Sequence, residues 1–229
     1  MNAILLAGGI GTRLRPITYT VPKCLVPIGG KPLLQIWIEA LRRAGILKIL
    51  INTHYLARQV EDFVSSLPFH DDIILAHEPV LLGTAGTLRQ NHDFFNGEDG
   101  LLIHADNYCL ADFSAFVSAH HARPGYCCMT MMTFTTDKPE RCGIVETDTV
   151  GVVTGFYEKV ENPPGNLANG AIYALSPQLV EMVMATGAMD FSLEVLPRLI
   201  NRIFTFHTLD TLVDIGTPSD YEKYKRFQN

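Results

Sequence analysis

The first half of the chain alternates short apolar runs with helix-like stretches, and this alternation restricts the fold more than any other feature. The strand-like runs lie near residues 2 to 7, 46 to 52, 72 to 77 and 100 to 105. Between them, residues 33 to 44 and 56 to 66 place apolar side chains on one helical face. This order is typical of a parallel sheet covered by helices, and it predicts an α/β fold.

The second half has a different pattern. Residues 127 to 175 form consecutive β-rich runs, broken by turn residues at 137 to 139 and 162 to 165. We expect antiparallel additions that make the sheet mixed but still mostly parallel. A final helix is predicted from a Thr217 cap, with Pro218 at its first position, to about Phe227. Since no linker separates the halves, residues 1 to 229 are predicted to form one domain with halves at 1–110 and 111–229.

Composition excludes several classes of protein. The formal net charge of -6 argues against sequence-independent binding to nucleic acid, which needs a surplus of Lys and Arg. The five cysteines are odd in number and form no CxxC pair, which disfavours a zinc site or a disulfide framework. No apolar run approaches the roughly 20 residues of a membrane-spanning helix. We expect a cytoplasmic protein that binds neither nucleic acid nor membrane, and its assembly into a homo-oligomer is left open.

A glycine-rich loop follows the first strand-like run. Three glycines in four positions let the backbone approach a polyphosphate and present N–H groups to it. The spacing matches neither the dinucleotide-binding pattern nor the P-loop, and a plain surface turn is the alternative. The expected nucleotide-binding residues here are Leu6, Ala7, Gly8, Gly9, Gly11, Thr12 and Arg13.

Three further charged residues are candidates for phosphate chemistry. Lys23 lies between prolines that stiffen the chain, so its ammonium can be held towards an α-phosphate. Asp106 and Asp214 each end an apolar run, where an α/β sheet places its ligands. Two carboxylates suffice for Mg²⁺ when phosphate oxygens and waters complete its shell. A turn-capping aspartate is the alternative for each residue taken alone.

The segment from Leu6 to Pro16, together with Pro22-Lys23, resembles the signature of the sugar-1-phosphate nucleotidyltransferases. The resemblance implies a Rossmann-like α/β/α sandwich of the GT-A-like kind, with the nucleotide held by the first half and the sugar by the second. It also implies catalytic roles for Arg13, Lys23, Asp106 and Asp214, with Asp106 and Asp214 as the Mg²⁺ ligands. Ala105 stands where the family more often has a glycine before the aspartate.

Base recognition is expected at two segments. Guanine offers two donors that a carboxylate can accept together, so Glu78 favours GTP over a pyrimidine nucleotide. A solvated strand-end charge is the alternative. Leu82-Gly83-Thr84-Ala85-Gly86, with that glutamate before it, resembles the guanylyltransferase branch of the family. Gly83, Thr84 and Ala85 are therefore expected to contact the nucleotide.

Sugar-phosphate recognition is expected in the second half. Phe156-Tyr157-Glu158-Lys159 and Asn169-Gly170-Ala171 resemble the family segments that hold the sugar hydroxyls and phosphate. Here Val160 follows the lysine where the family often has proline. The expected contacts are Asn107, Gly143, Glu158, Lys159, Asn169 and Gly170.

These features together predict guanylyl transfer from GTP to a sugar 1-phosphate, with release of pyrophosphate. The resemblance favours D-glycero-D-manno-heptose 1-phosphate or mannose 1-phosphate. One alternative is a uridylyl-, thymidylyl- or cytidylyltransferase of the same fold that acts on another phosphorylated sugar or small alcohol. Another is a subunit that senses nucleotide-sugars without turnover.

Overall fold

The computed structural model describes residues 1 to 226, and the chain divides into two compact units. The N-terminal unit comprises Asn2–Leu81, Ile103–Leu110 and the described residues from Thr211 onward. The central unit comprises Leu82–Leu102 and Ala111–Asp210, together with Met1. One domain with halves at 1–110 and 111–229 stays a prediction.

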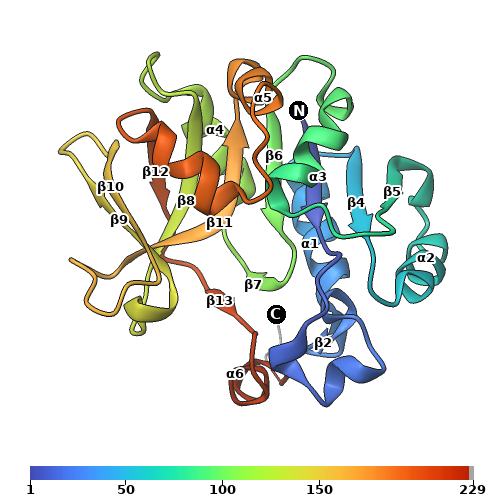
Figure 1. Ribbon diagram of the computed structural model, residues 1–229. Helices are drawn as coiled ribbons and strands as arrows, with labels where there is room; N and C mark the ends of the chain where they lie inside the picture. The colour runs from blue at the N-terminus through green and yellow to red at the C-terminus, as the bar shows by residue number, and fades with distance from the viewer. Residues whose placement is uncertain (227–229) are drawn as a thin grey trace. The chain divides into compact units, whose positions relative to one another are not determined.

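The N-terminal unit is built on parallel strands. β1 (Asn2–Leu6) pairs with β4 (Ile49–Thr53), and β4 pairs with β5 (Ile73–His77). Figure 1 shows β4 beside β5. The end of β6 (Gly100–His104) lies on the other side of β1. Every residue of β4 is buried, as in a parallel strand covered on both faces.

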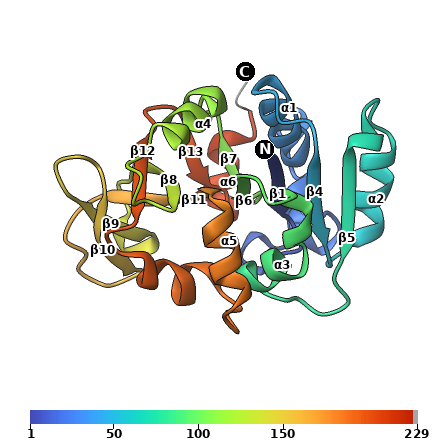
Figure 2. The same ribbon diagram turned by 90° about the horizontal axis from the view of Figure 1, so that it is seen from above.

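Helices α1 (Leu33–Arg43) and α2 (Ala57–Ser65) connect these strands, and α2 lies along β5 (Figure 2). The predicted strand at 46 to 52 begins three residues late, at Ile49. The reason is the end of α1, where Gly45 has φ +80° and the Ile46 N–H donates to the Leu41 carbonyl at 3.0 Å.

Smaller elements complete this unit. β2 (Pro27–Ile28) pairs with β3 (Lys31–Pro32), and β7 (Asn107–Cys109) pairs antiparallel with β13 (Leu212–Asp214). α6 (Pro218–Tyr224) begins as predicted, because the Thr217 side chain accepts from the Asp220 N–H. The predicted end of this helix, at Phe227, lies outside the described residues.

The central unit carries the antiparallel strands predicted for residues 127 to 175. β9 (Gly143–Thr147) pairs with β10 (Val153–Glu158) and β11 (Leu167–Leu175), and β11 also pairs with β8 (Met129–Thr135). β12 (Ile203–His207) runs parallel to β8. Met129, Met131 and Met132 are fully buried in this core.

Helices α3 (Thr84–Gln90), α4 (Phe113–His121) and α5 (Pro177–Met184) and a π-helix, Phe191–Val195, complete the central unit. The short 3-10 helices of the chain are Thr12–Leu14, Ile17–Tyr19, Lys23–Leu25, His70–Asp72, His92–Phe95, Pro139–Arg141 and Leu196–Leu199. The α/β class with a mixed, mostly parallel sheet and flanking helices is confirmed.

Candidate functional site

The glycine-rich loop leaves β1 and turns sharply at Gly11. Gly11 has φ +65°, a conformation that favours glycine, and the 3-10 helix Thr12–Leu14 follows it. A Cβ at Gly11 would lie 3.0 Å from Thr18 Cγ2 and 3.2 Å from Lys23 Cβ. The Thr18 hydroxyl donates to the Gly11 carbonyl at 2.7 Å. The turn therefore depends on glycine for both its backbone angle and its space.

Lys23 reaches the two predicted metal ligands at once. Its Nζ donates to Asp106 Oδ2 at 2.9 Å and to Asp214 Oδ1 at 3.1 Å. The Lys23 side chain is 7% exposed, whereas those of Asp106 and Asp214 are 43% and 48% exposed. The lysine thus lies beneath two carboxylates that solvent can reach.

Strand pairing brings these two distant aspartates together. Asp106 directly precedes β7, and Asp214 is the last residue of β13. The antiparallel register places Asp214 opposite Asn107. Residues more than a hundred positions apart therefore converge on one ammonium group.

Burial and charge oppose each other at Lys23. Burial acts to lower the pKa of its ammonium, but Asp106 and Asp214 outweigh it, so the pKa lies above its ordinary value. For Asp106, burial acts to raise the pKa, but the charge of Lys23 holds it below the usual range. Lys23 is therefore a cation and Asp106 an anion at neutral pH.

Arg13 adds a second cation to this cluster. Its Nη2 lies 3.3 Å from Asp214 Oδ2, and its side chain is 68% exposed. A Cβ at Gly216 would lie 2.7 Å from Asp214 Oδ2 and 3.0 Å from Arg13 Nη2, so glycine leaves room for this pair. We call Arg13, Lys23, Asp106 and Asp214 the charged cluster. All four predicted catalytic residues lie in it.

The charged cluster offers oxygen donors of the kind that Mg²⁺ prefers. Both carboxylates contact the same Nζ atom, so their oxygens lie close to one another. Two carboxylates with substrate phosphates and waters are a common Mg²⁺ environment. The residues present therefore fit a Mg²⁺ ion. Among residues 1 to 226, no group of three or more His, Cys, Asp or Glu side chains could hold a metal.

Asn52 ties the start of the glycine-rich loop to β4. Its Oδ1 accepts from the N–H groups of Ala7, at 2.7 Å, and Gly8, at 3.1 Å. Both backbone N–H groups therefore point at this side chain. No sequence pattern points to Asn52, because its role depends on the register of β4 against β1.

Glu78, the predicted guanine acceptor, follows β5 and is only 2% exposed. Its Oε1 accepts from Asn52 Nδ2 at 3.0 Å, and its backbone carbonyl lies 2.7 Å from His54 Nδ1. Glu78 is thus not the solvated charge considered as its alternative. Its contact with a base stays a prediction.

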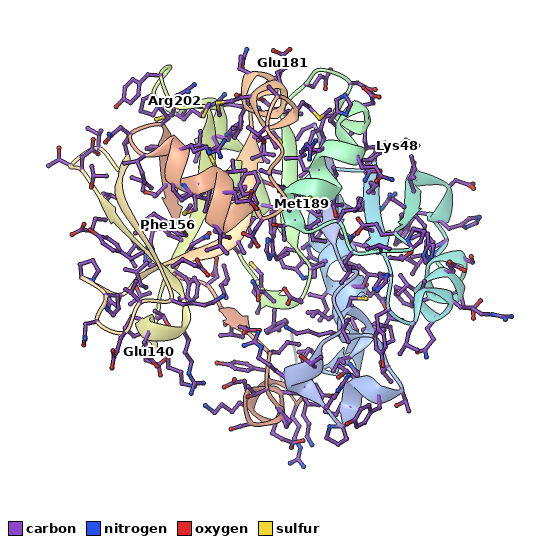
Figure 3. All side chains as sticks on the ribbon, in the orientation of Figure 1. Lys48, Glu140, Phe156, Glu181, Met189 and Arg202 are labelled. Atoms are coloured by element: carbon purple, nitrogen blue, oxygen red, sulfur yellow. The ribbon has the colours of Figure 1, made fainter. Side chains whose placement is uncertain are left out.

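In the central unit, Gly83, Thr84 and Ala85 hold the segment around Met189. The Ala85 N–H donates to the Met189 carbonyl at 2.9 Å, and the Thr84 hydroxyl accepts from the Phe191 N–H at 2.7 Å. Gly83 has φ +77°, and a Cβ there would lie 2.4 Å from the Met189 carbonyl oxygen. Figure 3 shows Met189 beside α3. These residues have a structural role here, and their nucleotide contacts stay predictions.

Glu158 ends β10 and forms an ion pair with the next residue, Lys159. Lys159 Nζ lies 3.0 Å from Glu158 Oε1, with side-chain exposures of 65% and 19%. Register places Glu158 opposite Gly143, where a Cβ would lie 2.5 Å from Glu158 Oε2. Lys159 has φ +51°, which a following proline disfavours, so Val160 in place of proline suits this backbone.

Asn169 and Gly170 lie at a β-bulge in β11. The register against β8 shifts between Asn169 and Tyr173, and Ala171 has φ +55°. The Asn169 side chain stabilises the bulge, because Oδ1 accepts from the Ala171 N–H at 2.9 Å and Nδ2 donates to Tyr173 Oη at 2.8 Å. The bulge therefore fixes the direction of the Asn169 side chain.

The predicted sites thus fall into groups within each unit. The N-terminal unit brings the charged cluster, the glycine-rich loop and Glu78 together around the ends of its parallel strands. It also holds Asn107, whose carbonyl accepts from Trp37 Nε1 at 2.9 Å. The central unit places Gly143, Glu158, Asn169 and Gly170 on the neighbouring strands β9, β10 and β11, with Lys159 directly after β10. As ligand contacts, all these assignments stay predictions.

One further property concerns membranes. Within residues 1 to 226, none of the helices has the length and apolar character that crossing a bilayer requires.

Comparison with known proteins gives one family across the chain. The model of the family described as "Nucleotidyl transferase" matches residues 2–229. A mannose-1-phosphate guanyltransferase of Schizosaccharomyces pombe is 31% identical over 235 residues, and one of Saccharomyces cerevisiae is 29% identical over 232. Each match covers 96% of this chain but only 62% and 63% of the relative, so the chain spans less than two thirds of their length.

Solved structures agree in fold. HddC from Yersinia pseudotuberculosis is 26% identical, with a TM-score of 0.82 over 98% of this chain and 97% of its own. HddC has also been solved in complex with GMP-PN. A Bacillus anthracis structure, 23% identical with a TM-score of 0.86, covers all of this chain and 96% of its own, and it supports the fold alone.

Proposed function

Because this chain belongs to the nucleotidyl transferase family, we propose that it transfers a guanylyl group from GTP to a sugar 1-phosphate and releases pyrophosphate. The charged cluster carries this proposal, since it combines two cations for phosphates with two carboxylates for a metal. The names of the relatives support the choice of guanine and of a mannose-like sugar, as does the GMP-PN complex of HddC.

The proposed reaction exchanges one phosphoanhydride bond for another. An oxygen of the sugar 1-phosphate attacks the α-phosphorus of GTP, and the bond to pyrophosphate breaks. A phosphate monoester has its second pKa near 6, so at neutral pH the attacking oxygen is mostly ionised and needs no base. The residues then only have to hold the two anions in line and stabilise charge on the α-phosphate and leaving group.

Each member of the charged cluster has a proposed task. Lys23 neutralises charge on the α-phosphate as it develops, and Arg13, which is exposed, binds the outer phosphates. Asp106 and Asp214 would hold Mg²⁺, which when bound supplies electrostatic stabilisation of the phosphates. Gly9, Gly11 and Thr12 bring the backbone close to the triphosphate, and Leu6, Ala7 and Gly8 border the nucleoside.

The central unit has the proposed task of binding the sugar 1-phosphate. Glu158 and Asn169 offer hydrogen-bond partners for hydroxyl groups, and Lys159 offers a cation for the phosphate. Gly143 leaves space beside Glu158, and Gly170 and Asn107 complete the proposed set. The preferred sugars are D-glycero-D-manno-heptose 1-phosphate and mannose 1-phosphate.

A pyrophosphate-release assay tests this function. Purified protein with Mg²⁺ is given GTP, ATP, UTP, dTTP or CTP, each with mannose 1-phosphate or manno-heptose 1-phosphate. Release that needs GTP, Mg²⁺ and one of these sugars is the expected result. Release with a pyrimidine triphosphate instead of GTP would reject guanylyl transfer. Binding of GTP without release from any pair would indicate a sensing subunit.

A further inference from the structure

The glycine-rich loop is held by a buried side chain outside the expected set of ligands. Asn52 lies near the end of β4 and is 4% exposed. Its Oδ1 accepts two hydrogen bonds, from the N–H groups of Ala7 and Gly8. These are the first two residues beyond β1. One amide oxygen therefore fixes two successive peptide groups where the chain leaves the sheet.

Glu78 fixes the orientation of the Asn52 amide. Asn52 Nδ2 donates to Glu78 Oε1 at 3.0 Å, and both side chains are buried. If the amide were flipped, its NH₂ group would face the two backbone N–H donors, and its oxygen would face the carboxylate of Glu78. Only one orientation satisfies all three hydrogen bonds. The negative charge of Glu78 thus selects an acceptor that faces the loop.

The peptide between Leu6 and Ala7 is held on both sides. Its N–H donates to Asn52, and its carbonyl accepts from the Ala105 N–H at 3.1 Å. The next peptide is held through the Gly8 N–H, and planarity directs the Ala7 carbonyl to the opposite side. A Cβ at Gly8 would lie 3.1 Å from Asn52 Nδ2, so glycine permits this close approach. The backbone is thus set before any ligand arrives.

We propose that Asn52, oriented by Glu78, is a positioning residue for nucleotide binding. This inference rests on the proposed function, because the loop is taken to be the nucleotide site. Without the two hydrogen bonds, binding must order the loop peptides at an entropic cost. The expected loss is about tenfold to a hundredfold in GTP affinity.

Variants that exchange the hydrogen-bond donor and acceptor between Asn52 and Glu78 test this proposal. In Asn52→Asp, a carboxylate can still accept from Ala7 and Gly8 but faces Glu78, so two like charges meet. In Asn52→Asp with Glu78→Gln, the glutamine amide donates to the new carboxylate and the pair regains its hydrogen bond with the original net charge. In Glu78→Gln alone, the glutamine oxygen still accepts from Asn52.

The affinity for a non-hydrolysable GTP analogue with Mg²⁺ is measured by calorimetry, beside the KM for the sugar phosphate. We expect a Kd about tenfold to a hundredfold higher for Asn52→Asp. The double variant should lie within about threefold of Glu78→Gln alone, because the exchanged hydrogen bond restores the acceptor that faces the loop. The KM for the sugar phosphate should change little in all three variants, whereas general loss of structure would disturb both substrates.

The matched control is the Gln35–Glu39 pair, where Gln35 Nε2 donates to Glu39 Oε1 at 2.9 Å on α1. Gln35→Glu introduces the same like-charge contact but should leave the analogue's Kd unchanged. If Asn52→Asp does not fold, the double variant compared with Glu78→Gln still decides, because rescue needs the exchanged hydrogen bond. A folded Asn52→Asp protein with wild-type affinity would overturn the proposal.

Failure of the proposal can be told from failure of the proposed function. A double variant that binds the analogue as weakly as Asn52→Asp would show that the orientation of the amide has no effect and that the positioning role is wrong. Wild-type protein that binds the analogue but releases no pyrophosphate would contradict guanylyl transfer, while the affinities of the variants would still decide the role of Asn52.

Discussion

Lys23 in the N-terminal unit and His120 in the central unit are both buried bases, yet their pKa values shift in opposite directions. Lys23 has two carboxylates within 3.1 Å, and their charge raises its pKa against the effect of burial. His120 has Thr130 Oγ1 at 3.0 Å from Nδ1 and Asp99 Oδ1 at 3.6 Å from Nε2. Burial and the neighbouring Arg123 outweigh Asp99 and lower its pKa to about 4. Burial has one sign for both residues, so the charges nearby decide which base remains a cation.

Removing the buried cation should produce the largest effect. Lys23→Ala should lower kcat about a hundredfold to a thousandfold, as loss of a preorganised charge at the reacting phosphate does. The KM values should change less, since Arg13 and the loop still bind the nucleotide. Steady-state pyrophosphate release with saturating substrates and Mg²⁺ provides the measurement.

The control for this variant is Lys48→Ala. Lys48 Nζ lies 2.9 Å from Asp72 Oδ1, but its side chain is 56% exposed. The ion pair is therefore as short as that of Lys23 but is accessible to solvent. The kcat of Lys48→Ala should equal that of wild type. Full turnover by Lys23→Ala would show that the buried ammonium has no part in the reaction.

The neutral histidine should make stability depend on pH. With a pKa of about 4 in the folded chain and 6.5 as its reference value, His120 takes up a proton more readily when unfolded. The contribution of neutral His120 to the free energy of unfolding is complete above pH 6.5 and is lost as the pH falls towards 4. The loss amounts to about 3 kcal/mol at most. Urea unfolding between pH 7 and 4 should show this slope in wild type and a smaller one in His120→Gln.

His121→Gln separates this effect from a general histidine effect. His121 Nε2 lies 3.8 Å from the same Asp99, but its side chain is 59% exposed. Its removal should leave the pH slope of unfolding unchanged. Identical slopes in wild type and His120→Gln would mean that another group causes any acid sensitivity.

The sequence predicts the main strands and helices of the fold but only part of the site. The parallel strands and their helices follow from long periodic segments, and they were predicted to within three residues. The convergence of Asp106 and Asp214 rests on β7 and β13, which are three residues each and too short to show a period. The bulge in β11 and the role of Asn52 depend on the register of other strands. Ala105, which stands where the family more often has glycine, is not among the described residues with positive φ.

Competition for the two carboxylates should sharpen the comparison further. A metal ion that binds Asp106 and Asp214 must share them with Lys23, whose charge repels it. Lys23→Met should therefore bind Mn²⁺ alone about tenfold more tightly than wild type, although its turnover falls. Electron paramagnetic resonance of free Mn²⁺, without nucleotide, measures this affinity. The double variant with Asp106→Asn should lose the gain, and an unchanged affinity in Lys23→Met would exclude the competition.

The smallest expected effect depends on shape rather than charge. In the central unit, a Cβ at Gly143 would lie 2.5 Å from Glu158 Oε2 and 2.8 Å from the Phe156 ring. Gly143→Ala should displace Glu158 and raise the KM for the sugar 1-phosphate about fivefold, because one hydroxyl contact is weakened. The KM for GTP should stay constant, as measured by varying each substrate at saturation of the other. Gly125→Ala, where a Cβ meets nothing within 4 Å, is the control. A rise in the KM for GTP instead would indicate that Gly143 and Glu158 take part in nucleotide binding.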